Sequence, residues 1–130
     1  MKNLTLGVIG VDHRHIFGQL GKMLELGCTC KGWWTEGDPE PVEGFLQRFP
    51  DIPRVTDRDN LLQDPDIDMI LIADVLVRRS ARAIEAMQAG KDVMTDKPGC
   101  TTLKQLDSIK ACAAKTGRIW PIDFSERFEV

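Results

Sequence analysis

Short apolar runs alternate along the chain with segments in which apolar residues recur every three or four positions. The apolar runs have strand length and comprise residues 4–9, 28–34, 67–73, 93–94 and 119–124. The helical periodicity covers residues 16–24, 42–49, 81–87 and 103–114. Strands that are apolar without alternation are typical of parallel sheets buried on both faces. The alternation of strands and helices therefore predicts an α/β fold, a doubly wound parallel sheet in three layers, α/β/α.

Turn and capping residues set the boundaries of these elements. Gly27 and Gly90 follow helical segments directly, which is the position where glycine commonly ends a helix. Asp38 is placed to cap the helix that follows it. Thr56 or Asp57 can cap a short helix before the predicted strand at residues 67–73. These signals support short connections between strands and helices.

Composition narrows the class of protein. The 130 residues suffice for one domain, 42% of them are hydrophobic and 28% are charged, as in soluble globular proteins. A net charge of −3 gives no indication of a nucleic-acid partner. No apolar run has the length of a membrane span, and the first residues lack the features of a signal peptide. We therefore expect one domain over residues 1–130, no membrane partner and a cytoplasmic location.

The cysteines do not suggest a metal site. A domain with its own core does not need disulfides, so we expect reduced thiols. Cys28 and Cys30 lie two positions apart in a predicted strand and so share one face of the sheet. No second pair of cysteines or histidines has the spacing of a zinc site, so we expect no metal there.

The first predicted strand ends at Gly10 and leads into a helix. In a Rossmann-like fold this turn binds pyrophosphate on the amides at the start of the helix, so Gly10, Val11, Asp12 and His13 are candidate cofactor contacts. Asp12 and His15, however, occupy the second and third glycine positions of the G-x-G-x-x-G pattern. The Asp12 carboxylate either repels the pyrophosphate or turns away to cap the helix.

Two histidines flank Arg14 in the same turn. Asp12, His13 and His15 form a possible metal triad, although ligands so close in sequence rarely converge on one ion. The preferred interpretation is that one histidine lines a ligand cleft while the other packs or caps the helix. No serine or cysteine nucleophile stands beside them, so a hydrolase triad is not indicated.

Glu36 follows the second predicted strand, about 26 residues after Gly10. Dinucleotide-binding domains place an acidic residue near this position, where it accepts hydrogen bonds from the adenosine ribose hydroxyls. This position favours NAD over NADP. The alternative is that Glu36 and Asp38 are solvated acids of a turn.

Lys97 lies at the end of a predicted strand and precedes Pro98. Proline prevents the strand from continuing and restricts Lys97 to an extended backbone. The carboxyl ends of strands are where open α/β sheets bind ligands, so Lys97 is a candidate for binding or catalysis. The alternative is a solvated surface lysine after a turn.

Four stretches together resemble the N-terminal domain of the glucose-fructose oxidoreductase, inositol dehydrogenase and MocA family (Gfo/Idh/MocA), over nearly the whole chain. They are residues 6–10, residues 64–73, the helix-to-strand passage at residues 83–93, and Asp96-Lys97-Pro98. The last is similar to the family's Glu-Lys-Pro signature. Residues 124–128 resemble its Asn-x-Arg-Phe stretch, with Arg127 in the arginine position.

This resemblance implies a Rossmann domain that binds NAD or NADP. Lys97 would contact the nicotinamide ribose and the substrate hydroxyl and assist proton transfer, with Asp96 replacing the glutamate beside it. Glu36 would hold the adenosine ribose. Ala73, Asp74 and Val75 would form the loop beside the cofactor.

Departures from the family pattern also fall at this site. Arg79 stands where members often carry histidine, residues 74–76 replace a Thr-Pro-Asn type of loop, and Asp12 replaces a glycine. Each change bears on the affinity for the cofactor or on its type.

The family carries its substrate pocket on a second α/β domain, whereas this sequence ends at Val130. We therefore expect the cofactor half of an oxidoreductase that transfers a hydride between nicotinamide and a sugar, cyclitol or related polyol. A homo-oligomer would form through the absent domain. The alternative is a non-catalytic Rossmann module that acts as a nucleotide sensor or a scaffold for a partner.

Overall fold

The computed structural model describes residues 3–96, 102–120 and 122–123. Lys97 and Arg127 lie outside these ranges, so their predicted roles are not tested by the structure. The elements, in chain order, are β1 (Thr5–Val11), α1 (His15–Glu25), β2 (Thr29–Trp34), α2 (Pro41–Arg48), α3 (Asp59–Leu62), β3 (Met69–Ala73), α4 (Leu76–Gln88), β4 (Asp92–Asp96), α5 (Leu103–Thr116) and β5 (Ile122–Asp123).

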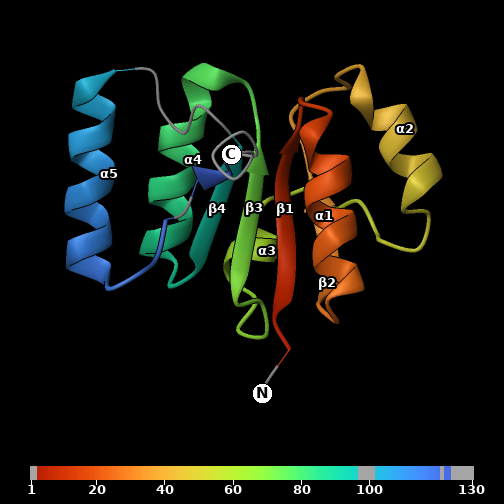
Figure 1. Ribbon diagram of the computed structural model, residues 1–130, viewed down its shortest axis with the longest axis horizontal. Coiled ribbons are helices and arrows are strands. Elements are labelled where there is room, and N and C mark those ends of the chain that lie inside the picture. Colours follow the sequence, from red (N-terminus) through yellow and green to blue (C-terminus); the bar gives the residue numbers. More distant parts are fainter. Residues whose placement is uncertain (1–2, 97–101, 121, 124–130) are drawn as a thin grey trace, which may run out of the picture.

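The strands form one sheet in the order β2-β1-β3-β4-β5, and every neighbouring pair is parallel. The chain moves outward from β1 to β2 and then returns across β1 to place β3 on its other side (Figure 1). The order therefore reverses between β1 and β3, which is the position where doubly wound sheets bind ligands. Arg54 adds a single parallel bridge to Trp33 on the outer edge of β2, with Trp33 N donating to Pro53 O at 3.1 Å and Val55 N to Trp33 O at 2.8 Å. This short pairing stands where a classical dinucleotide fold has its outermost strand, and it was not predicted as one.

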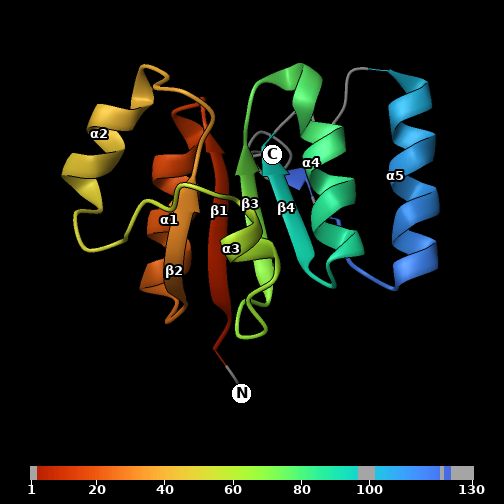
Figure 2. The same ribbon diagram turned by 180° about the vertical axis from the view of Figure 1, so that it is seen from behind.

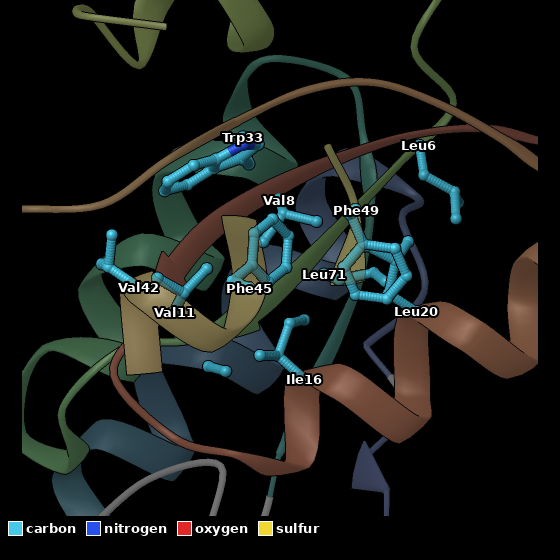
Figure 3. Close-up of a cluster of buried hydrophobic side chains, with 11 residues drawn as sticks. Leu6, Val8, Val11, Ile16, Leu20, Trp33, Val42, Phe45, Phe49 and Leu71 are labelled. Atoms are coloured by element: carbon cyan, nitrogen blue, oxygen red, sulfur yellow. The ribbon is translucent and has the colours of Figure 1, made fainter. Parts of the chain in front are cut away.

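Helices cover both faces of the sheet, as predicted. Helices α1 and α2 lie on one face, while α3 and α4 lie on the other and α5 packs against α4 (Figures 1 and 2). Side chains alternate between the two layers along each strand, so Leu6 and Val8 join one core and Ile9 joins the other. Figure 3 shows the first core, in which Trp33 and Phe45 lie together with ring centroids 4.8 Å apart.

The predicted helix ends are mostly confirmed. Gly27 and Gly90 both have positive φ, at 97° and 86°, as expected after a helix. Asp57 Oδ1 accepts a hydrogen bond from the backbone of Asp59 at 2.9 Å, so Asp57 supports the start of α3. The prediction for Asp38 is wrong: α2 begins at Pro41 without a side-chain cap, and Asp38 instead accepts a hydrogen bond from Arg54 at 3.0 Å.

A buried lysine holds two strands together at the edge of the sheet where the strands begin. Lys91 is 5% exposed, and its Nζ donates to the carbonyls of Asp64 and Ile67 at 2.5 and 2.7 Å. These carbonyls belong to the turn that leads into β3. Lys91 thus serves as a structural ammonium that joins the start of β4 to the start of β3.

Candidate functional site

The turn after β1 lies tightly against the end of β3. The backbone amides of Asp12 and His13 both donate to Ala73 O, at 3.0 and 3.2 Å. Gly10 has φ of 87°, and a Cβ at this position would lie 2.7 Å from the backbone N and Cα of Asp74. Only glycine fits both the backbone conformation and this contact. The predicted residues Gly10, Asp12, His13, Ala73 and Asp74 are therefore brought together at the switch point of the sheet.

Asp12 does not cap α1. Its Oδ1 accepts a hydrogen bond from Thr35 Oγ1 at 3.4 Å, and Thr35 in turn accepts from Val11 N at 3.1 Å. Partial burial raises the pKa of Asp12, and the neighbouring carboxylate of Asp74 raises it further. Asp12 thus links the ends of β1 and β2 and adds negative charge to the turn. The side chain of Val11 is buried, so only its backbone belongs to this edge.

Histidines occupy the entry to α1. The backbone N of His15 donates to His13 Nδ1 at 3.2 Å, and the two rings lie 4.2 Å apart between centroids. His13 therefore caps the first turn locally, which is one of the two roles predicted for this pair. Within the ranges given above, no group of three histidine, cysteine or acidic side chains is placed to hold a metal ion.

Asp74 is a buried carboxylate held by arginines of α4. Its side chain is 1% exposed, and its Oδ1 accepts from Arg78 Nε at 3.1 Å while its Oδ2 accepts from Arg82 Nε at 2.9 Å. Arg79, also buried, donates to the backbone carbonyl of Asp74 at 2.7 Å. Residues 74, 78 and 82 are spaced four apart, as on one face of a helix, so this spacing is the sequence signal for the cluster. Arg79, a predicted cofactor contact, lies inside the fold.

Glu36 is ion-paired to Arg78, which extends from the buried Asp74 toward the end of β2. Because β1 lies between β2 and β3, this pair spans the end of β1 above the turn that contains Gly10. Arg54 holds the other side of the same β2 turn, donating to Gly37 O at 2.6 Å and to Asp38 at 3.0 Å. The acid predicted to bind ribose is therefore at the expected edge, beside two arginines that sequence analysis missed.

A cavity of about 420 Å³ opens at the carboxyl end of β2, within the size range of small-molecule sites. It is lined by Trp34, Thr35, Arg54, Val55 and Thr56. The guanidinium carbons of Arg58 and Arg82 lie 5.3 and 5.0 Å from the centroid of the Trp34 ring, close enough for cation–π contact. Guanidinium groups from the N-cap of α3 and from α4 thus hold the indole in place beside the cavity that it lines.

The remaining predicted residues are placed as follows. Val75 is 37% exposed at the start of α4, and the backbone of Asp96 ends β4 at the same edge. The sheet register aligns Trp34, Ile9, Ile72 and Thr95 in one row, so the chain leaves all four strands at one edge. Lys97 follows Asp96 in the sequence but, like Arg127, it lies outside the described residues.

Comparison with known proteins shows which family this chain resembles. The family model for GFO_IDH_MocA, described as an oxidoreductase family with an NAD-binding Rossmann fold, matches residues 36–124. Inositol 2-dehydrogenase of Acidothermus cellulolyticus is 30% identical over 124 residues, covering 95% of this chain and 35% of that protein. D-xylose dehydrogenase of Paenarthrobacter nicotinovorans is 34% identical over 62 residues, covering 48% of this chain and 16% of that protein.

A solved structure from Erwinia carotovora atroseptica SCRI1043 has a TM-score of 0.87 and 30% sequence identity, and covers 92% of this chain and 36% of that one. The chain spans 24%, 23% and 35% of the lengths of three curated relatives that it matches. Among the described residues, none of the helices combines the length and apolar character needed to cross a membrane.

Proposed function

Because the chain belongs to the Gfo/Idh/MocA oxidoreductase family and forms its NAD-binding Rossmann domain, we propose that it binds the nicotinamide cofactor of a sugar, cyclitol or related polyol dehydrogenase. The observation that carries the proposal is the reversal of strand order between β1 and β3, with Glu36 following β2 and β4 ending at the same edge of the sheet. The names of two relatives, an inositol and a D-xylose dehydrogenase, support the substrate class.

The adenosine half of the cofactor fits the residues present. The cavity at the end of β2 offers the indole of Trp34 and the apolar side chain of Val55 to an adenine ring. Glu36 follows Thr35, which lines that cavity, and its side chain is 54% exposed, so we propose that its carboxylate accepts hydrogen bonds from the two ribose hydroxyls. We propose that NAD is the preferred cofactor on this ground.

The pyrophosphate would lie over the turn from Gly10 to His13, where the chain enters α1. Helix N-termini favour anions because their amides and dipole point outward. The Asp12 carboxylate opposes this attraction. The Arg78 guanidinium acts on Asp12 in the direction that lowers its pKa, so we propose that it offsets part of this opposition. The site therefore retains an anion-binding turn that is weaker than one built from glycines alone.

Lys97 is the proposed chemical residue. It follows β4 in the sequence, and β4 delivers the chain to the edge where Gly10 and Asp74 lie. A lysine ammonium there can hydrogen-bond a carbinol oxygen and exchange its proton, while the nicotinamide cofactor supplies the hydride chemistry. The substrate pocket is proposed to lie on a further domain of a longer protein.

Titration of this chain with NADH tests the proposal. Energy transfer from the indoles to the reduced nicotinamide, checked by calorimetry, is expected to saturate. Glu36→Ala should weaken binding roughly tenfold or more, as expected for loss of a charged hydrogen-bond partner. Glu25→Ala is the control because this exposed acid ends α1 at the other edge of the sheet. No binding by the unchanged chain at millimolar NADH would favour a non-catalytic scaffold instead.

The proposed role of Lys97 has to be tested in a protein that also carries the substrate domain. Lys97→Met is expected to abolish most turnover there while NADH binding remains measurable. Normal turnover by that variant would refute the assignment.

A further inference from the structure

Asp12 and Asp74 form a pair of carboxyl groups at the turn between β1 and α1. The backbone N of Asp12 donates to Ala73 O at 3.0 Å, which fixes Asp12 beside the β3–α4 turn, and the Asp74 side chain is 1% exposed. Burial raises the pKa of Asp12, and both the charge of Asp74 and a hydrogen bond between the two carboxyl groups raise it further. The pair is therefore arranged to hold a proton between its members.

The two carboxyl groups have different partners. Asp74 is paired with Arg78 Nη2 at 3.0 Å and with Arg82 Nε at 2.9 Å. Asp12 instead accepts a hydrogen bond from a neutral hydroxyl, Thr35 Oγ1, at 3.4 Å. Protonation of Asp74 would weaken two ion pairs, whereas protonation of Asp12 removes the repulsion between the carboxylates. The proton therefore belongs on Asp12.

Charged and titratable groups from each neighbouring element surround Asp12. They are His13, Arg14 and His15 of its own turn and α1, Glu36 after β2, Glu40 at the start of α2, and Asp74, Arg78, Arg79 and Arg82 of the β3–α4 turn and α4. With both histidines neutral, the arginines of this set match its acids while Asp12 is ionised. A protonated Asp12 leaves one excess positive charge, which a bound anion would balance.

The backbone amides of this turn are partly used inside the fold. Those of Asp12 and His13 donate to Ala73 O, and that of His15 donates to His13 Nδ1 at 3.2 Å. An anion at this turn therefore depends on the charges of the side chains more than it would at a glycine-rich turn.

We infer that Asp12 takes up a proton from solvent when the pyrophosphate of the cofactor binds, so that this domain holds its cofactor more tightly at acidic than at alkaline pH. The inference rests on the proposed cofactor site and adds the regulation of its affinity. One oxygen of the protonated carboxyl becomes a hydroxyl that donates to Asp74, and the other still accepts from Thr35. Proton uptake thus removes a negative charge beside the pyrophosphate and keeps the link between β1 and β2.

Calorimetric titration of the full 130-residue chain with ADP-ribose, at intervals between about pH 5 and about pH 8, tests the inference. ADP-ribose carries the pyrophosphate of the cofactor, and the charge of this group stays constant over the range. Titrations in two buffers of different ionisation enthalpy count the protons taken up. The unchanged chain should take up a fraction of a proton at acidic pH. It should bind roughly tenfold more weakly at the alkaline end, since a rise of about one unit in the pKa of Asp12 on binding corresponds to about tenfold in affinity.

Asp12→Asn keeps an oxygen that can accept from Thr35 and is uncharged at every pH. At about pH 8 it should bind ADP-ribose roughly tenfold more tightly than the unchanged chain, and at acidic pH it should take up no proton through this position. A gain in affinity is a result that the loss of a merely structural contact does not produce. Glu25→Gln is the matched control because this exposed acid ends α1 at the other edge of the sheet, and it should change neither the affinity nor the proton count.

The two histidines also titrate in this range and need a variant of their own. A chain with His13→Asn and His15→Gln removes both imidazoles, and asparagine can still accept from the backbone N of residue 15. Proton uptake should persist in this chain. If it disappears here and persists in Asp12→Asn, the histidines carry the proton and the inference is overturned.

The remaining outcomes separate the inference from the proposed function. Failure of the unchanged chain to bind either ADP-ribose or NADH at any pH would overturn the cofactor site and the inference together. Binding of ADP-ribose with constant affinity and no proton uptake would overturn the role of Asp12 alone. Weaker binding by a folded Asp12→Asn chain at every pH would show that the carboxylate only holds the turn in place, and would also overturn it.

Discussion

Gly10→Ala tests whether the close contact between β1 and the β3–α4 turn is required. Two costs add at this position. A left-handed backbone costs an L-residue about 1–2 kcal/mol. The new Cβ would also lie 2.7 Å from the backbone of Asp74, and forcing such a contact apart costs about 1–3 kcal/mol. The free energy of unfolding should fall by roughly 2–5 kcal/mol, which lowers Tm by roughly 6–20 °C for a chain of this length.

The chain contains two control positions. Gly90 has φ of 86°, nearly the same as the 87° of Gly10, and a Cβ there would meet nothing within 4 Å. Gly90→Ala therefore measures the backbone cost alone, about 1–2 kcal/mol. Gly18 lies inside α1 with no neighbour near its Cβ position, so Gly18→Ala should stabilise the chain by about 0.5–1 kcal/mol.

Urea unfolding followed by circular dichroism gives the three free energies. The difference between Gly10→Ala and Gly90→Ala isolates the contact with Asp74. If the two variants lose the same stability, the turn yields without cost, and the argument that glycine is needed for close approach is refuted.

Three other predictions concern the side chains of Lys91, Asp12 and Cys30. Lys91→Met should lower the free energy of unfolding by about 2–4 kcal/mol, because two carbonyls lose a charged donor, whereas exposed Lys22→Met should stay within about 0.5 kcal/mol in the same urea experiment. Because the pKa of Asp12 is raised in the folded chain, the folded chain binds the proton of this carboxyl more tightly than the unfolded chain does. Protonation of Asp12 therefore stabilises the fold fully at low pH, and this stabilisation is lost as pH rises through the folded pKa. Asp12→Asn should therefore unfold at a higher temperature than the unchanged chain at pH 7, and the difference should shrink toward pH 4. Burial raises the pKa of Cys30 to about 11, so roughly one thiol in a thousand is ionised at pH 8, and iodoacetamide with mass spectrometry should leave Cys30 unlabelled in the native chain and labelled in urea.

The fold was predictable because buried parallel strands leave a plain signal. The apolar run at residues 67–73 became β3, and glycines marked the ends of α1 and α4 where they were expected. The pairing of Arg54 with Trp33 gave no such signal, since one bridge requires no run of β-forming residues. Asp38 was misassigned because a nearby arginine competes for its carboxylate, and this arginine is 16 positions away in sequence.

The candidate site was only partly predictable for the same reason. Glu36 and Gly10 could be found because a strand and a turn position them locally. The ion pair of Glu36 with Arg78 joins residues 42 apart, and only the strand order β2-β1-β3 brings them across the same turn. Sequence could identify which residues belong to the edge of the sheet, but it could not show which of them neutralise one another.

Two acidic departures from the family pattern, Asp12 and Asp74, are best understood together. Asp12 places a carboxylate where a dinucleotide turn normally has none, and Asp74 places a second one beside it. Taken alone, each would repel a pyrophosphate. Arg78 and Arg82 lie about one and two helical turns after Asp74. Their guanidinium groups pair with its carboxylate, which is buried from solvent. The edge thus has carboxylates neutralised by arginines where a neutral, glycine-rich turn would need no such compensation, and we expect the affinity for an anionic cofactor to depend on these arginine contacts.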